Sequence, residues 1–283
     1  MLVVLAIVLA PIIGGLLSGI DRKITARLQG RFGPPILQPF YDVIKLFGKE
    51  RFISNKVQIV WVITYLFFAM LSFVLFVLGQ DLIAIIFVLT VGGGAMVMGA
   101  LSIRSPYSQI GAQREIMQML AYDPLLLIAI VGMYMVTGSF KVDDIVNYQI
   151  THNAPLLYTL PLVFLVMIEV LTIKMRKSPF DIAASHHGHQ EIVRGVHTEF
   201  SGPYLALIEI AHWYELMLVL GLVAIFFASN VYIALALVAA AFILELIIDN
   251  VTARVTFRMM LKSAWVYGMI ICLINLIALS FLK

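Results

Sequence analysis

The sequence predicts an all-α integral membrane protein with about eight transmembrane helices. Its 283 residues are 62% hydrophobic and only 12% charged, with a mean hydropathy of +1.01, whereas soluble domains are about half apolar and a quarter charged. The apolar residues also form runs of the roughly 20 residues that a helix needs to cross a bilayer. We therefore expect a single polytopic domain over residues 1–283 in the cytoplasmic membrane. A net charge of only +3 gives no reason to expect nucleic acid as a partner.

Eight runs of the sequence are long and apolar enough to be these helices. The first run is preceded by no positive residue and followed by no small-residue cleavage site, so it does not have the pattern of a cleavable signal. The external turns Gly79–Asp81 and Ser229–Asn230 are only a few residues long. The predicted spans are roughly 2–20, 57–79, 82–103, 116–138, 155–175, 203–228, 230–248 and 262–282.

Lysine and arginine predict the orientation, because cytoplasmic loops carry an excess of them. The loop after the first run holds eight, and the loops after the third, fifth and seventh runs hold two, four and three. Of the 19 in the chain, only Lys141 and the terminal Lys283 fall on the other side. We therefore expect both termini outside and long cytoplasmic loops after the odd-numbered helices.

Two of the cytoplasmic stretches are expected to form amphipathic helices. Ile36–Phe47 repeats apolar side chains at helical spacing, which suits a helix lying at the membrane surface. Ile103–Met119 is more polar. Both stretches could lie at the interface between lipid and water, or could pack against a docked soluble subunit. The apolar stripe of the first stretch consists of Ile36, Phe40, Ile44 and Phe47.

Acidic side chains occur inside the predicted spans, where a charge costs several kcal/mol unless it is paired or hydrated. At a rise of about 1.5 Å per residue, three of them lie roughly 10 Å in from the cytoplasmic ends of their spans. Glu245 lies near the same surface, Glu215 lies near the midplane, and the outer half has no comparable acid. This distribution predicts a half-channel that passes its proton sideways to a neighbouring subunit. The five acids are Asp123, Glu169, Glu209, Glu215 and Glu245.

A proton relay is the hypothesis that we draw from these acids. His212 is three residues from both Glu209 and Glu215, so it shares a helical face with each in turn. The alternative is that the acids are structural and are hydrogen-bonded to His212, Tyr122, Tyr214 or Lys174. The expected relay consists of Asp123, Glu169, Glu209, Glu215 and His212.

The loop Ser178–Gly202 holds four of the six histidines between two apolar segments. A helical zinc site prefers histidines at positions i and i+4, whereas the first three here are spaced by one and two residues, so we expect no metal. A solvated loop with incidental histidines is possible, but we favour a polar interface beneath a docked subunit, where histidine would exchange protons near neutral pH. The expected cytoplasmic mouth of the relay consists of Asp181, His186, His187, His189, Glu191, His197 and Glu199.

Cysteine usage excludes a metal cluster within this chain. The single cysteine, Cys272, cannot form a disulfide within the chain, and it cannot supply the several thiolates of an iron–sulfur cluster or a nickel–iron site. We therefore expect no cofactor here, and any redox metals would belong to other subunits.

The segment DRKITARLQGRFGPPILQPFYDVIKLFGKE (Asp21–Glu50) resembles the signature of the subunit-one family of respiratory complex I. In that family a basic A-R-x-Q-G-R-x-G-P stretch precedes L-Q-P-x-x-D-x-I-K-L. The segment SPFD followed by HTEFSG is similar too, and so is AYDP, in which Asp123 stands at the family's intramembrane glutamate. The resemblance covers essentially the whole chain and its eight spans.

Departures from the family pattern favour one subtype. Quinone-linked members carry P-E-A-E after PFD, whereas this chain has IAASHHGHQ, which is similar to the membrane subunit of Ech-type energy-converting nickel–iron hydrogenases. Lys174 and Lys177 stand where the family has a glutamate and an arginine before PFD. The short length of the chain fits the same hydrogenase subtype. Two alternatives to this subtype are a subunit of a quinone-reducing complex and a purely structural anchor with no ion path.

The resemblance implies a membrane anchor beneath a ferredoxin-oxidising, proton-reducing hydrogenase arm, coupled to H⁺ or Na⁺ movement. The implied partners are the hydrogenase large and small subunits, a ferredoxin-like iron–sulfur subunit and an antiporter-like membrane subunit. The iron–sulfur clusters and the nickel–iron centre would lie in those partners, and no chemical step is expected from this chain alone. Basic residues expected to hold the docked subunit or to balance the acids are Arg27, Arg31, Arg114, Lys177 and Arg194.

Overall fold

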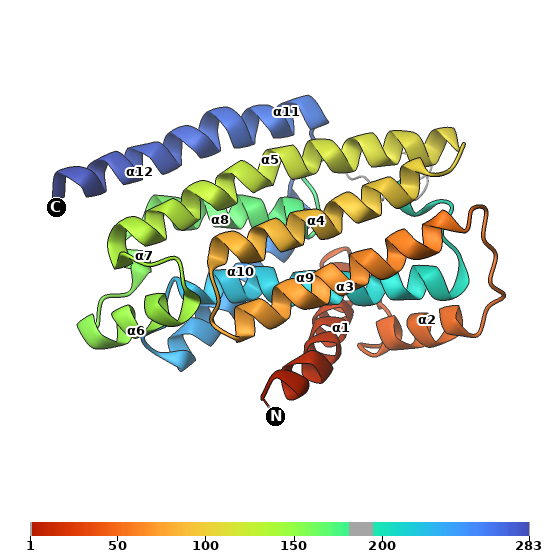
Figure 1. Ribbon diagram of the computed structural model, residues 1–283, viewed down its shortest axis with the longest axis horizontal. Helices are drawn as coiled ribbons and strands as arrows, with labels where there is room; N and C mark the ends of the chain where they lie inside the picture. The colour runs from red at the N-terminus through yellow and green to blue at the C-terminus, as the bar shows by residue number, and fades with distance from the viewer. Residues whose placement is uncertain (1, 181–194, 283) are drawn as a thin grey trace. The chain divides into compact units, whose positions relative to one another are not determined.

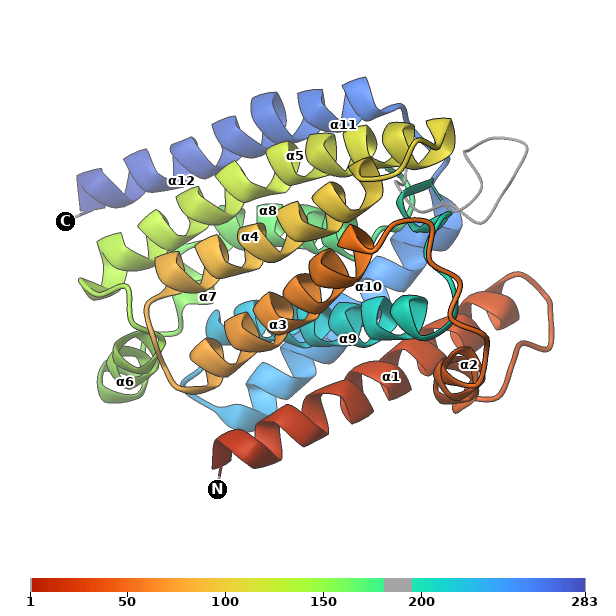
Figure 2. The same cartoon turned by 45° about the vertical axis from the view of Figure 1, so that its right-hand side comes forward.

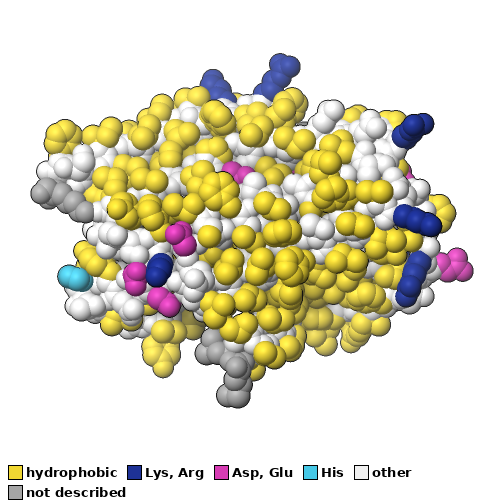
Figure 3. Space-filling model, in the orientation of Figure 1, with side chains coloured by type: hydrophobic (Ala, Val, Ile, Leu, Met, Phe, Trp, Pro, Cys, Tyr) yellow, Lys and Arg dark blue, Asp and Glu magenta, His cyan; other side chains and the backbone are white. Residues whose placement is uncertain are grey.

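The computed structural model describes residues 2–180 and 195–282. Seven helices in this part of the chain are long and apolar enough to cross a membrane, which confirms the predicted all-α membrane class. Hydrophobic side chains cover most of the visible face in Figure 3. The elements (Figure 1) are α1 (Leu2–Leu28), α2 (Gln38–Phe47), α3 (Val57–Val77), α4 (Leu82–Leu101), α5 (Pro106–Thr137), α6 (Val142–His152), α7 (Leu156–Thr159), α8 (Pro161–Lys174), the 3₁₀ turn η1 (Gly195–His197), α9 (Gly202–Ile225), α10 (Val231–Val251), α11 (Phe257–Lys262), the π-helical segment η2 (Ser263–Gly268) and α12 (Met269–Leu282).

The predicted fifth span, 155–175, is broken into α7 and α8. α7 makes one turn and α8 has only 14 residues, so neither is long enough to be counted with the seven. Leu160, between them, has φ −124° and ψ 47°, which lies outside the helical region. Pro161 then starts α8, and proline has no N–H with which to continue the preceding helix.

A side chain from α12 bonds to the backbone at this break. The Asn275 side-chain oxygen accepts hydrogen bonds from the N–H groups of Leu162 and Val163 at 3.0 and 3.3 Å. Its amide nitrogen donates to the carbonyl of Thr159 at 3.0 Å. The break is therefore stable inside an apolar helix bundle because one buried amide satisfies groups on both of its sides.

Three other boundaries differ from the prediction by five residues or more. α1 continues to Leu28, and α5 starts at Pro106, ten residues before the predicted span, so it includes most of the stretch expected to be a separate surface helix. The last span begins at Phe257 as α11 and passes through η2 before α12. In each case the helix continues into polar sequence that the apolar pattern does not mark.

The chain divides into two compact units, each described separately below. The first unit contains the described residues of Met1–Val74, Val88–Met117 and Ile182–Met217. The second unit contains those of Leu75–Phe87, Gln118–Asp181 and Leu218–Lys283.

In the first unit, α2 lies beside α1 (Figures 1 and 2) and also packs on α9. Gly19 of α1 allows the close approach, because a Cβ atom there would overlap the carbonyl of Ile36. Phe40 of α2 packs on Trp213 of α9, with ring centroids 5.2 Å apart. These contacts fix α2 on the transmembrane helices.

The predicted apolar stripe of α2, expected to face the membrane surface or a docked subunit, is divided between two environments. Ile36 precedes the helix, and Phe40 packs inward, but Ile44 and Phe47 are 66% and 47% exposed. The buried residues of α2 are Pro39 and Val43. They lie on the face of the helix that packs against α9.

In the second unit, α8 packs against α10, α12 and η2. Val163, Val170 and Leu171 of α8 are fully buried by these neighbours. α8 is therefore the central element of this unit although it is too short to span a bilayer alone.

Candidate functional site

The predicted site residues that the structure describes fall into two groups, one in each unit. The first unit contains Arg27, Arg31, Arg114, His197, Glu199, Glu209, His212 and Glu215. The second contains Asp123, Glu169, Lys177 and Glu245. Asp181, His186, His187, His189, Glu191 and Arg194 lie outside the described residues.

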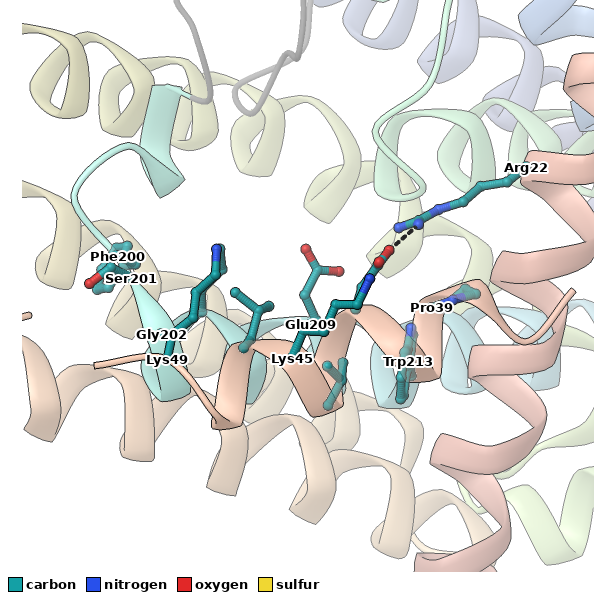
Figure 4. A pocket seen from close by; sticks show the side chains of 13 residues that line it. Arg22, Pro39, Lys45, Lys49, Phe200, Ser201, Gly202, Glu209 and Trp213 are labelled. Carbon is teal, nitrogen blue, oxygen red and sulfur yellow. Dashed lines mark hydrogen bonds and ion pairs between the residues drawn. The ribbon is translucent and has the colours of Figure 1, made fainter. Parts of the chain in front are cut away.

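A cavity of about 440 Å³ lies between α2 and the start of α9 in the first unit (Figure 4). The predicted relay acid Glu209 lines it and is partly exposed. An ion pair between Arg22 of α1 and Asp42 of α2, 2.7 Å long, lies at its side. Two lysines of this region, Lys45 and Lys49, complete the charged lining. The cavity gives one predicted relay residue a direct opening to its surroundings.

Glu209, His212 and Glu215 follow one another along α9 at intervals of three residues. Each is rotated about 60° from the one before, because the helix has about 3.6 residues per turn. His212 is therefore beside both acids, while the acids themselves are about 120° apart. Glu209 lines the cavity and Glu215 is only 5% exposed, so the row leads from the cavity into the packed interior.

Two more rings meet His212 in the first unit. The ring centroid of His197, from η1, lies 5.3 Å away, and that of Tyr65, from α3, lies 5.8 Å away in an edge-on arrangement. His197 and Tyr65 are 7% and 1% exposed. The structure thus brings together His197, predicted at the mouth, and His212, predicted in the relay. No sequence pattern pointed to Tyr65, because its position beside His212 depends on the packing of α3 on α9.

The turn that carries His197 is fixed by close packing on α5. A Cβ atom at Gly111 would overlap the backbone of Val196, so only glycine allows η1 to approach this closely. Glu199, which follows the turn, accepts a hydrogen bond at its carbonyl from Gln58 at 3.5 Å. The segment that carries His197 is therefore held by the close packing on α5 and by a side chain of α3.

Glu115 is a buried acid that the sequence reasoning missed. It is 4% exposed and lies one turn after Gly111 on α5, in the first unit. The predicted span began at residue 116, so Glu115 was assigned to a polar surface stretch. Hydrophobic periodicity could not have found it, because Ile110 and Ile116 of the same stretch are exposed whereas Ser108 and Gln118 are buried with Glu115.

The basic residues of the first unit lie mostly at the surface. Arg27 is exposed, with its guanidinium 5.3 Å from the centroid of Phe32. Arg31 is exposed and donates to the side chain of Gln29. Arg114 is partly exposed. These positions leave the predicted docking role open to test.

In the second unit, Lys177 forms a buried ion pair with Glu245 of α10. The N–O distance is 2.8 Å, and the side chains are 10% and 0% exposed. Lys177 was predicted either to hold a docked subunit or to balance an acid. The buried ion pair has the geometry expected of the second role. The next residue, Ser178, donates its N–H to Asp249 of α10 at 2.9 Å. The chain after α8 is therefore attached to α10 through two acidic side chains.

Glu169 and Lys174, both of α8, also have short polar contacts. Ser263, the first residue of η2, donates to Glu169 at 2.6 Å, and π-helical turns are frequent at functional sites. Lys174 donates to the hydroxyl of Tyr122 at 3.1 Å, beside the partly buried Asp123 on α5. The alternative, in which the acids are structural, included a hydrogen bond from Tyr214 to an acid. In the structure, Tyr214 donates to the carbonyl of Ile7 in the first unit.

Metal-binding side chains do not come together within the described ranges. No group of three His, Cys, Asp or Glu residues there could hold a metal ion. Cys272 is buried in α12. The functional groups that the described part of the chain contributes to the candidate site are therefore carboxylates and imidazoles, which can bind protons.

Comparison with known proteins identifies the family. The family model described as NADH dehydrogenase matches residues 1–280. The chain belongs to this family. The resemblance to the subunit-one family of respiratory complex I is thereby confirmed, and this NADH dehydrogenase family member is a complex I-like, multi-pass membrane protein.

Three matches illustrate the range of the family. A subunit of the NADH-quinone oxidoreductase of Carboxydothermus hydrogenoformans is 30% identical over 217 residues, which cover 70% of this chain but only 61% of that protein. Hydrogenase-4 component C of Escherichia coli strain K12 is 28% identical over 277 residues, covering 88% of this chain and 86% of that one. A chain of the membrane-bound sulfane sulfur reductase, an archaeal respiratory membrane complex, superposes with a TM-score of 0.89 at 28% identity over 98% of both chains.

Proposed function

We propose that this chain is the membrane-anchoring, ion-translocating subunit of an energy-converting nickel–iron hydrogenase complex. The complex would oxidise ferredoxin, reduce protons, and move H⁺ or Na⁺ across the membrane. Support comes from the likeness to hydrogenase-4 component C over most of both chains and from the IAASHHGHQ segment after PFD. Its partners would be the hydrogenase large and small subunits, a ferredoxin-like subunit and an antiporter-like membrane subunit, which would hold all the metal centres.

The observation that carries the translocation role is the row Glu209, His212 and Glu215 on α9. It starts at a cavity, continues through an imidazole that contacts His197, and ends at a buried carboxylate. Ionisable groups inside a membrane protein mark ion paths by default, because burying them is costly. Imidazoles take up and release protons near neutral pH, so His212 can pass a proton between the two acids beside it.

The basic loops support a cytoplasmic position for the cavity. Lys45 and Lys49 belong to the loop that holds eight of the Lys and Arg residues, and such loops stay in the cytoplasm. The row on α9 would then run inward from the cytoplasm, with both termini of the chain outside. Asp123 and Glu169 would be further relay members in the second unit.

Replacing Glu215 by glutamine tests the proposal. In inverted membrane vesicles that contain the whole complex, we expect hydrogen production from reduced ferredoxin to continue while the ion gradient is largely lost. The matched control is Glu50→Gln, which neutralises an exposed glutamate of the same unit. Glu215→Asp should restore part of the gradient, because it retains a group that titrates.

A purely structural anchor predicts a different result from the same vesicles. If Glu215→Gln leaves both hydrogen production and the gradient unchanged, this chain does not carry the ion through that residue. Repeating the measurement with a sodium ionophore and with a protonophore identifies the ion, since only one of them would collapse the gradient directly.

A quinone site is the second candidate, and the cavity favours it. A volume of about 440 Å³ lies in the range of small-molecule sites, and Trp213, Phe200 and Leu205 give it an apolar wall. The Carboxydothermus relative is named as part of an NADH-quinone oxidoreductase. Reduction of a short-chain quinone by the purified complex, lost in Trp213→Ala, would support this candidate. Hydrogen production without quinone and no quinone reduction would exclude it.

A further inference from the structure

α2 has three faces with different side chains. The buried face contains Pro39, Val43 and Leu46 and packs toward α9. The opposite face is exposed and apolar, with Leu37, just before the helix, at 48%, Tyr41 at 48% and Ile44 at 66%. These three residues recur at intervals of four and three, so they form one stripe. In a membrane protein such a stripe lies against lipid.

The third face of α2 is polar and lies between the other two. It contains Gln38, Asp42 and Lys45, and Lys49 follows one turn later. Asp42, Lys45 and Lys49 line the cavity together with Glu209 of α9, and in Figure 4 both lysines and Glu209 extend to the same side of α2. The polar face is thus continuous with the lipid-facing stripe on one side and with the cavity on the other.

The charged groups of the cavity leave one positive charge in excess. Three cations, Arg22, Lys45 and Lys49, line it with two acids, Asp42 and Glu209. Arg22 and Asp42 neutralise each other at 2.7 Å. The remaining pair of lysines therefore exceeds Glu209 by one charge, which is the charge of one phosphodiester. Lysine ammonium groups at a membrane surface attract anionic lipid headgroups.

We propose that the groove between α2 and α9 binds one acidic phospholipid of the adjacent leaflet. Its phosphate lies between Lys45 and Lys49, and a headgroup hydroxyl donates to Glu209. An acyl chain follows the exposed stripe of Leu37, Tyr41 and Ile44, which is why a lipid fits this place better than a free phosphate. The site depends only on the membrane location of the chain, so the proposed ion translocation can fail without affecting it.

Native mass spectrometry of the full chain, purified with its co-purifying subunits in a neutral detergent, tests the site. Phosphatidylglycerol and phosphatidylcholine with identical acyl chains are the probes. We expect one phosphatidylglycerol to be retained at concentrations at which phosphatidylcholine is not. Each lysine near a membrane surface contributes about fivefold to the binding of an anionic lipid, so Lys45→Gln with Lys49→Gln should weaken retention roughly 25-fold.

Matched variants separate the site from general charge effects. Lys56→Gln removes an exposed lysine outside the cavity and should bind phosphatidylglycerol like the unchanged chain. Lys45→Arg with Lys49→Arg retains both charges and should restore binding. Ile44→Ser removes an apolar side chain that is 66% exposed and should weaken binding a few-fold without affecting folding.

Three results would each overturn the inference. The first is equal retention of phosphatidylcholine, or of a quinone that carries no phosphate. The second is unchanged retention of phosphatidylglycerol in the double glutamine variant. The third is binding of glycerol phosphate as tight as that of phosphatidylglycerol, because the acyl chains would then contribute nothing.

Discussion

Two ion pairs, one in each unit, have nearly the same length but different surroundings. Arg22–Asp42 of the first unit is 2.7 Å long, with side chains 42% and 39% exposed. Lys177–Glu245 of the second unit is 2.8 Å long, with side chains 10% and 0% exposed. Water screens the charges of the first pair and competes for hydrogen bonds to its groups. The groups of the second pair are buried, so water cannot replace the partner of either group. Burial and not distance therefore decides what each pair contributes.

The same difference extends to the groups around each pair. In the second unit, Glu245, Glu169 and Lys174 each have a hydrogen bond to a side chain from another segment of the unit. In the first unit, Glu209 lines an open cavity and His212 meets the rings of His197 and Tyr65. The helices of the second unit thus form a rigid support for its charged groups, including the proposed relay acid Glu169, whereas the first unit has a cavity where ions or ligands can exchange.

The largest expected effect comes from breaking the buried pair. Lys177→Met leaves the carboxylate of Glu245 buried without this cation, and losing one partner of a buried pair costs about 3–5 kcal/mol. We expect a large drop in the thermal unfolding temperature of the chain in detergent. Lys262→Met, at an exposed lysine of the same unit, is the control and should have little effect.

The double variant Lys177→Met with Glu245→Leu sharpens this prediction. An apolar pair of similar volume often replaces a buried ion pair without loss, so most of the lost stability should return. Unfolding temperatures that are equal for Lys177→Met and Lys262→Met would contradict the contrast between the two units.

The next largest effect is expected at the break between α7 and α8. Asn275→Ala removes the bonds to the N–H groups of Leu162 and Val163 and to the carbonyl of Thr159. Because these groups are then buried without that partner, we expect a loss of about 2 kcal/mol. Thermal unfolding measures it, with Asn147→Ala, at an exposed position on α6, as the control. An unfolding temperature as high as that of the control would show that the break does not depend on Asn275.

Much of the fold could be predicted because the length of an apolar run is a local property of the sequence. Seven of the eight predicted runs match helices that are long enough to span the membrane. The break in the other run was not predictable in this way, because the Asn275 side chain that satisfies its backbone lies more than 100 residues further along the chain. Pro161 was a visible signal of a helix start, but its consequence depends on α12.

The candidate site shows the same limit. The row Glu209, His212 and Glu215 follows from spacing on one helix, so the sequence was enough to propose it. The contact of His212 with His197 and Tyr65 depends on three separate elements. The pairing of Lys177 with Glu245 spans 68 residues, and no local pattern assigns one acid to one cation.

A smaller effect is expected from the bond between Ser263 and Glu169. Ser263→Ala removes a donor 2.6 Å from a carboxylate, and hydrogen bonds to charged groups contribute about 1.5–3 kcal/mol. Because Glu169 is partly exposed, we expect a loss near the lower end, about 1.5 kcal/mol. Ser263→Thr retains the hydroxyl and serves as the control in thermal unfolding. Equal unfolding temperatures for the two variants would mean that the bond contributes nothing to the rigid support.

The smallest effect is expected at the exposed pair. Arg22→Gln should lower stability by less than about 1 kcal/mol, because pairs in contact with water contribute little and salt screens them. Thermal unfolding at low and high salt measures this, and Arg51→Gln, at another exposed arginine of the first unit, is the control. A loss as large as that of Lys177→Met, independent of salt, would mean that the rim of the cavity is as rigid as the second unit. The cavity could then not adapt to an ion or a lipid headgroup as its exposed charges suggest.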